Sequence, residues 1–114
     1  MLVNEAMNKD VVVAKRDATI KEASEVMSKF GISSLVVTEE NKIIGIITGS
    51  DIVRSVANDK PADTTLVEEI MSKKVITIEG DKKIEDAVDL MIENKVKELP
   101  VVEDDKIKGI ITVT

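Results

Sequence analysis

The sequence predicts a mixed α/β (α+β) fold made of two tandem β-α-β-β-α repeats. Residues 3–50 recur as residues 67–114 after a gapless shift of 64 positions, and 18 of the 48 aligned pairs are identical. Within each copy, short β-branched runs and helical patterns follow one another in the same order. A repeat of this length indicates two copies of one supersecondary unit, each too small to bury its own core well. Two similar units packed face to face would form two similar clefts, so function is expected where the copies differ.

Each copy begins with a strand that is followed by a helix. The β-branched segments at residues 11–14 and 75–78 are bounded by turns and predict the strands. Apolar residues three and four positions apart then predict one apolar helical face in each copy. This face consists of Ile20, Ala23, Met27 and Phe30 in the first copy, and of Ile84, Ala87, Val88 and Met91 in the second. Residues 19–22 match a capping box, and Gly31 or Asn94 is expected to supply the left-handed residue that ends each helix.

A pair of strands comes next, and a second helix follows it in the first copy. The expected strands are residues 34–38 with 41–48 and residues 98–102 with 106–112, joined by acidic turns at 39–41 and 103–105. The second helix is expected at residues 50–57, and residues 58–65 form a linker in which Thr65 caps a short helix. The sequence thus divides into residues 1–60, the first repeat with a short helical lead-in, and residues 61–114, the linker and a second repeat without a closing helix.

The composition excludes several classes of function. An apolar content of 43% and a charged content of 33% are typical of a soluble globular protein, and the net charge of −6 argues against a nucleic-acid groove. No apolar run approaches the ~20 residues of a membrane span and no apolar signal segment is present, so a cytoplasmic location is expected. Cysteine and histidine are absent, and Phe30 is the only aromatic residue. A metal site, a catalytic cofactor and catalytic residues are therefore not expected.

The doublet, the lead-in Val3-x3-Met7 and the segment from Gly45 to Ile52 (Gly-Ile-Ile-Thr-Gly-Ser-Asp-Ile) resemble tandem CBS domains, which are named after cystathionine β-synthase. A pair of these domains is called a Bateman module, and the resemblance covers nearly the whole chain. It implies two repeats that pack through their sheets with pseudo-twofold symmetry. It also implies a non-catalytic regulatory module that binds an adenosyl ligand (AMP, ADP, ATP or S-adenosylmethionine) between the repeats. Ligand binding would be transmitted to a regulated partner, and a module that responds to adenine nucleotides would serve in energy sensing.

The end of the predicted strand 41–48 carries the ligand-binding hypothesis. Gly49 lets a ligand approach the backbone closely, and the helix that follows offers free N–H groups and a partial positive charge to a phosphate. The hydroxyls of Thr48 and Ser50 add donors, and the carboxylate of Asp51 can accept hydrogen bonds from two ribose hydroxyls. The pattern Thr48-x-x-Asp51 is also that of an ordinary capping box, and both roles are compatible.

The resemblance implies that the other repeat completes this cleft. Carried over by position, Ile76 and Val96 would sandwich the adenine, and Lys97 would neutralise a phosphate. The residues alone are equally consistent with a plain core role for the first two and with a solvated surface lysine for the third. Arg54, one turn beyond Asp51, is either a second cation for the ligand or an ion-pair partner of a nearby carboxylate.

The resemblance also implies a second cleft, which departs from the pattern. Val12, Ile32 and Ser33 of the first copy would pair there with Thr112 and Thr114 of the second. The position that aligns with Asp51 would follow Thr114, so no carboxylate is expected to recognise a ribose in this cleft. The second cleft is therefore expected to be the weaker one.

Self-association is expected as well. In the first copy the closing helix carries Ile52, Val53 and Val56, and the second copy lacks the cover that such a helix gives to apolar surface. We therefore expect a homodimer or a larger assembly. The alternative to ligand binding is a ligand-free interaction or dimerisation module in which Thr48 and Asp51 only cap a helix. A small hydrolase with paired carboxylates is the poorest fit, because histidine and a Gly-rich phosphate loop are absent.

Overall fold

The computed structural model describes residues 1–112, and its contacts divide the chain into two compact units. Residues 12–75 form the first-repeat unit, whereas Met1–Val11 and the chain from Ile76 onward form the second-repeat unit. The division at residue 60 stays a prediction from the sequence, and the packing groups the lead-in segments differently. Each lead-in joins the unit that contains the other repeat. No helix within residues 1–112 has the length and apolar character needed to cross a membrane.

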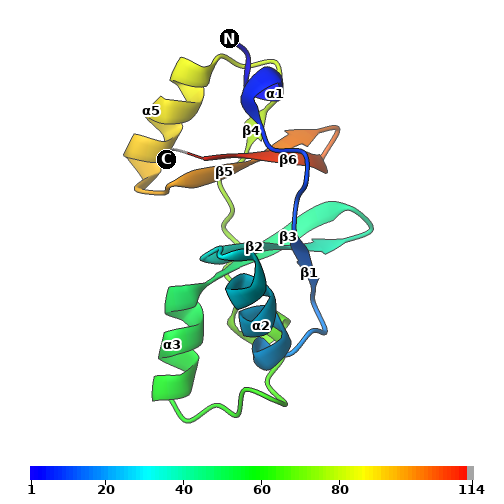
Figure 1. Cartoon of the computed structure of the whole chain (residues 1–114), viewed down its shortest axis with the longest axis vertical. Helices are drawn as coiled ribbons and strands as arrows, with labels where there is room; N and C mark the ends of the chain where they lie inside the picture. Colours follow the sequence, from blue (N-terminus) through cyan, green and yellow to red (C-terminus); the bar gives the residue numbers. More distant parts are fainter. Residues whose placement is uncertain (113–114) are drawn as a thin grey trace. The chain divides into compact units, whose positions relative to one another are not determined.

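The first-repeat unit is a three-stranded sheet covered by a helix, with a second helix after the last strand (Figure 1). Strand β1 pairs in parallel with β2, which pairs antiparallel with β3, and the β2–β3 register shifts between Val37 and Thr38. The elements of this unit are β1 (Val13–Lys15), α2 (Ile20–Phe30), β2 (Ser34–Glu39), β3 (Lys42–Thr48), α3 (Gly49–Ala57) and α4 (Val67–Ile70).

The second-repeat unit reproduces this arrangement. Strand β4 pairs in parallel with β5, which pairs antiparallel with β6. Each pair of facing residues in these strands matches a pair in the first-repeat unit after a shift of 64 positions. The irregularity recurs between Val101 and Val102. The elements of this unit are α1 (Val3–Ala6), β4 (Ile78–Glu79), α5 (Ile84–Asn94), β5 (Glu98–Glu103) and β6 (Lys106–Thr112). The predicted order of strands and helices is confirmed in both copies.

A helix and a lead-in valine build the core of each unit. In the first-repeat unit, Ala23 and Met27 of α2 pack with Leu35, Val37 and Ile47 of the sheet and with Val67 of the lead-in. The corresponding core of the second-repeat unit consists of Val3, Ile78, Ala87, Met91, Leu99, Val101 and Ile111. Burial of these side chains stabilises each unit at roughly 25 cal/mol per Å² of apolar surface. The apolar helical faces predicted from the sequence therefore point into cores, with two exceptions. Phe30 is 53% exposed at the end of α2, and Val88 is half-buried outside the core, against which Leu90 packs instead.

The lead-in methionines explain the glycine that both copies share. A Cβ placed on Gly45 would lie 2.5 Å from the sulfur of Met71, and one placed on Gly109 would lie 2.6 Å from the sulfur of Met7. The residue after each methionine also pairs with the sheet, since the amides of Ser72 and Asn8 donate to strand carbonyls at 2.9 and 2.8 Å. Only glycine leaves room for this close approach. The recurrence of methionine and glycine in the sequence is thus one packing contact made twice.

Four local expectations differ from the structure. The first strand of each copy is shorter than predicted and begins two or three residues later, because only Val13–Lys15 and Ile78–Glu79 lie opposite a partner. Helix α3 begins at Gly49 rather than Ser50, directly after its N-cap. Asn94 is the last helical residue, and Lys95, which aligns with Gly31, takes the left-handed conformation. Leu66 rather than Thr65 is the N-cap of α4, since its amide donates to Glu69 at 2.7 Å.

Both hairpins turn through acidic residues, as predicted. Glu40 and Asn41 join β2 to β3, and Asp104 and Asp105 join β5 to β6. All four have positive φ angles between 52° and 67°. Two successive left-handed residues make the turn that matches the twist of a tight hairpin, and asparagine and aspartate tolerate this conformation better than most residues do.

Candidate functional site

The predicted phosphate and ribose contacts lie where β3 passes into α3. The strand ends at Thr48, which is the N-cap of the helix, and the helix dipole places partial positive charge at this end. The amide of Asp51 donates to the hydroxyl of Thr48 at 3.2 Å, while the amide of Thr48 donates to a carboxylate oxygen of Asp51 at 2.9 Å. The capping box that the sequence predicted is therefore formed. Ser50 is exposed in the first turn.

One carboxylate oxygen of Asp51 closes this box, and the other accepts a hydrogen bond from Arg54 at 3.2 Å. The side chain of Asp51 is 15% exposed, whereas that of Arg54 is 67% exposed. Of the two roles considered for Arg54, the structure shows the ion pair. A carboxylate offers about four lone-pair positions, so Asp51 retains acceptor capacity on the oxygen that faces Arg54.

One residue predicted for the weaker cleft, Ser33, lies beside this helix start. The amide of Gly49 donates to the carbonyl of Ser33 at 3.0 Å, and Thr48 lies opposite Ser34 in the sheet. Ile32 and Val12 are half-buried and pack against the core of the same unit. The first-repeat unit thus gathers Thr48, Ser50, Asp51, Val12, Ile32 and Ser33, which the sequence had assigned to two different clefts.

The remaining predicted residues belong to the second-repeat unit. Ile76 and Val96 are half-buried against its core, and Lys97 is exposed just before β5. Thr112 ends β6 opposite Glu98, whereas Thr114 lies outside the described residues. Since Thr48, Ser50 and Asp51 lie in one unit and Ile76, Val96 and Lys97 in the other, their meeting in one cleft stays a prediction.

Sequence reasoning missed Glu98, the neighbour of Lys97. Its carboxyl is half-buried, and this desolvation raises its pKa above the ordinary value because burial disfavours the charged form. The aligned residue in the first copy is Ser34. An acid therefore stands in the second copy where the first has a small neutral residue, at the start of a strand with a buried apolar run. This difference between the two repeats is visible in the sequence and could have indicated a perturbed carboxyl.

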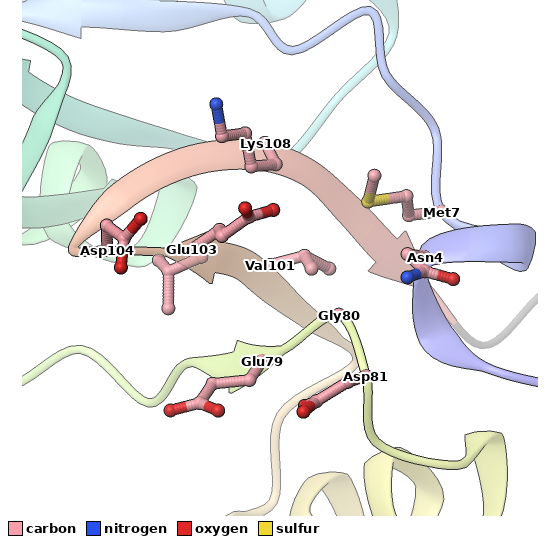
Figure 2. Close-up of a pocket in the computed structure, with 10 residues that line it drawn as sticks. Asn4, Met7, Glu79, Gly80, Asp81, Val101, Glu103, Asp104 and Lys108 are labelled. Carbon is pink, nitrogen blue, oxygen red and sulfur yellow. The ribbon is translucent and has the colours of Figure 1, made fainter.

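Sequence reasoning also missed a pocket that recurs in each unit, between the lead-in helix, the hairpin tip and the segment after the first strand. In the second-repeat unit it has a volume of about 430 Å³ (Figure 2). It is lined by Asn4, Met7, Glu79, Gly80, Asp81, Val101, Val102, Glu103, Asp104 and Lys108. The equivalent pocket of the first-repeat unit, of about 550 Å³, includes Arg16, which donates to Glu68 at 2.6 Å and to Glu39 at 2.7 Å. Among residues 1–112, no group of three or more acidic side chains is placed to hold a metal ion.

Comparison with protein families and curated proteins agrees with the fold. A family model described as "CBS domain" matches residues 3–58 and again residues 67–114. A protein named MK0525, from Methanopyrus kandleri, is 38% identical over 114 residues, which span 97% of this chain and 58% of that protein. The inosine-5'-monophosphate dehydrogenase of Methanocaldococcus jannaschii is 39% identical over 112 residues, which span 96% of this chain and 22% of the enzyme. The chain therefore corresponds to only part of each of these two relatives.

Solved structures agree as well. The CBS domain NE2398 has a TM-score of 0.90 at 30% identity, and the match covers 98% of this chain and 91% of that one. The CBS domain pair of protein MJ0100, in complex with 5'-methylthioadenosine and S-adenosyl-L-methionine, has a TM-score of 0.87 at 32% identity. That match covers 98% of this chain and 89% of the other. The predicted fold of two tandem repeats is confirmed.

Proposed function

Because the chain belongs to the CBS domain family, we propose that it is a non-catalytic regulatory module that binds an adenosyl ligand and transmits its occupancy to a partner protein. The observation that carries the proposal is the MJ0100 pair, a relative of the same fold in complex with two adenosyl compounds. AMP, ADP, ATP and S-adenosylmethionine are the candidate ligands. We place the module in the cytoplasm, where these compounds are made, and a response to adenine nucleotides would make it an energy sensor.

The first-repeat unit supplies groups suited to the ribose and to a phosphate. The free acceptor capacity of Asp51 suits vicinal ribose hydroxyls, and the hydroxyl of Ser50 is exposed at the start of α3. Helix α3 has nine residues, and the partial positive charge at its start favours a phosphate there, while the amides of Gly49 and Asp51 already donate to Ser33 and Thr48. In this proposal Thr48 acts through the cap, since its hydroxyl and amide already bond Asp51 and hold the carboxylate in place.

The second-repeat unit supplies groups suited to the adenine and to a charge. Ile76 and Val96 are the proposed apolar contacts of the ring, which fits a chain with a single aromatic residue. Lys97 is exposed and is the proposed phosphate partner. A second, weaker ligand cleft would use Val12, Ile32 and Ser33 with Thr112.

Calorimetric titration with AMP, ADP, ATP and S-adenosylmethionine tests this function. We expect micromolar binding by at least one of them, and Asp51→Ala should weaken it by about 1.5–3 kcal/mol, the usual worth of a hydrogen bond to a charged group. The matched control is Glu22→Ala. It opens the capping box at the start of α2, where the amide of Thr19 donates to Glu22 at 2.9 Å. Both variants lose a helix cap, and only the first should lose ligand. Absence of heat with all four compounds, or equal affinity in both variants, would contradict the proposal.

A ligand-free dimerisation module is the second candidate function, and the exposed face of α3 favours it. Val53 and Val56 are 69% and 57% exposed on this helix. Apolar side chains at such a spacing lie on adjacent turns of one face, and burying them against a second copy would stabilise a homodimer. Sedimentation of wild type and of the double variant Val53→Asp/Val56→Asp distinguishes the cases. A monomer at all wild-type concentrations would exclude self-association.

A further inference from the structure

The pocket of the first-repeat unit contains the arginine Arg16, whereas the aligned position in the second-repeat unit is Gly80, which has no side chain. In the first-repeat unit the guanidinium of Arg16 bridges Glu39 on the hairpin and Glu68 on the lead-in helix. The hydrogen bond to Glu39, followed by that to Glu68, raises the pKa of Arg16 further above its ordinary value. The bridge therefore joins two elements that are distant in sequence through a permanently charged group.

The second-repeat unit keeps the backbone of this pocket. The amide of Asn4 donates to the carbonyl of Gly80 at 2.9 Å, just as the amide of Glu68 donates to the carbonyl of Arg16 at 3.1 Å. Gly80 thus occupies the backbone position of the arginine. A Cβ placed on it would lie 3.0 Å from the Cβ of Asn4, so the close packing of the lead-in leaves little room for a side chain.

The acceptors of the pocket also persist where the donor is lost. On the hairpin, Glu103 is the counterpart of Glu39. On the lead-in helix, Asn4 is the counterpart of Glu68, and its side-chain amide oxygen can also accept hydrogen bonds. Asp81 and Asp104 align with acidic residues of the first copy, and Glu79 reverses the charge of Lys15. Four carboxylates therefore line the pocket together with a single lysine.

That lysine does not neutralise the pocket. In Figure 2 the side chain of Lys108 extends away from Glu79 and Asp81, which lie on the opposite side. Within residues 1–112 the ion pairs are those of Arg16 and Arg54, and none joins Lys108 to a carboxylate. The pocket consequently retains its negative charge, which disfavours an anionic ligand.

We propose that this pocket of the second-repeat unit binds a guanidinium group supplied from outside the chain. The independent observation that points to this ligand is Arg16, a guanidinium already held by the aligned acceptors of the aligned pocket. A planar guanidinium matches a carboxylate and a neighbouring amide oxygen better than a compact ammonium does. A metal ion is a poorer fit because the described acidic side chains form no group of three suited to one. None of the lining residues is in the proposed adenosyl site, so the two proposals stand or fall separately.

The test is an NMR titration of the ¹⁵N-labelled chain with methylguanidinium at low ionic strength, with methylammonium as the control cation. We expect saturable amide shifts at Gly80, Asp81, Glu103 and Asp104, and weaker or no saturation with methylammonium. Glu103→Gln should weaken the binding about two- to fivefold, as expected for an exposed charge pair. A separate titration with S-adenosylmethionine reports on the adenosyl site in the same sample.

Arg16→Ala supplies a positive control inside the same molecule. Removal of this side chain vacates the first-repeat pocket, and methylguanidinium should then also shift the amides of Glu39 and Glu68. Shifts at the vacated pocket alone would overturn the proposal, and so would shifts at neither pocket, equal effects of methylammonium, or unchanged binding in Glu103→Gln. Two further ligands distinguish the source of the group. Tighter binding of N-acetyl-arginine N-methylamide indicates an arginine side chain of a partner protein, and tighter binding of agmatine indicates a small guanidino compound.

Discussion

The two units share their backbone and their packing, but they differ in their charged side chains. Strand registers, the hairpin irregularity and the contact between methionine and glycine recur with a shift of 64 positions. By contrast, Arg16 is replaced by Gly80 and Ser34 by Glu98. Where the lead-in methionine packs against the sheet, both copies have glycine, because the same close contact must be built twice. The two replacements named above lie at exposed or partly exposed positions, where a change leaves the fold intact and alters what the surface can bind.

The largest expected effect tests whether the two cores are equivalent. Met27 and Met91 occupy aligned positions in the two cores, and both are nearly fully buried. Truncation to alanine should lower the free energy of unfolding by about 2–5 kcal/mol in either unit, through lost burial and the cavity left behind. Thermal and urea unfolding of both variants measures this. Neither unit alone has a large core, so we expect one shared transition. Two separate transitions, of which each variant shifts only one, would contradict that expectation.

The next effect compares the two crowded glycines. A methyl group on Gly109 would lie 2.9 Å from the carbonyl oxygen of Asn8, whereas one on Gly45 would lie 3.0 Å from that of Ser72. Both alanine variants should lose about 1–3 kcal/mol of stability by overpacking. Urea denaturation gives the two values. Gly31→Ala is the control for a glycine whose neighbourhood is open but whose φ of 64° strains any other residue. No loss in Gly45→Ala or Gly109→Ala would refute the packing explanation of the repeat.

A smaller, pH-dependent effect is expected at Glu98. A carboxyl whose pKa is raised in the folded state costs nothing below the ordinary glutamate pKa of about 4.3. It destabilises the protein progressively as the pH rises through its folded-state pKa, because the unfolded chain ionises first. Glu98→Gln should therefore stabilise the chain at pH 7 relative to wild type and leave stability at pH 3 unchanged. Denaturation curves at both pH values test this, with Ser34→Gln as the aligned control in the other unit. A gain of equal size at both pH values would rule out ionisation as the cause.

The smallest effect is expected at Arg16. Its side chain and that of Glu39 are about half exposed, so water and salt screen the attraction between them. Arg16→Ala should lower stability slightly at low salt and by less at 1 M salt, where the Debye length is about 3 Å. A double-mutant cycle with Glu39→Gln measures the coupling. A large loss that salt does not change would show that Arg16 acts through packing instead.

The repeat in the sequence accounts for most of the fold. Spacing of apolar residues predicted both long helices, and the acidic turns predicted both hairpins. The two first strands were predicted too long because their ends depend on partner strands elsewhere in the chain, whereas the missed helix ends are local shifts of one residue. Asn94 was chosen for its tolerance of positive φ, but the helix ends one residue later because the geometry of the repeat assigns the left-handed position to Lys95.

The candidate site was less predictable. The capping box of Thr48 and Asp51 follows from local spacing and is present. The ion pair that Arg54 forms with Asp51 was one of two options, and it is present in the structure, while the role of Arg54 as a cation for the ligand stays a prediction. Glu98 and the pocket beside Gly80 were missed because their meaning appears only when the aligned residues of the other copy are placed in space.

The sequence by itself determined the doublet, the element order, the family and the single Thr-x-x-Asp helix start within the first copy, since these depend on local spacing and composition. Only the tertiary structure decided that each lead-in packs with the other repeat, that Met7 and Met71 crowd the shared glycines, and that one pocket holds an arginine while its counterpart does not. Contacts between residues that are distant in the sequence are selected by packing and hydrogen bonding, and a linear pattern does not record them.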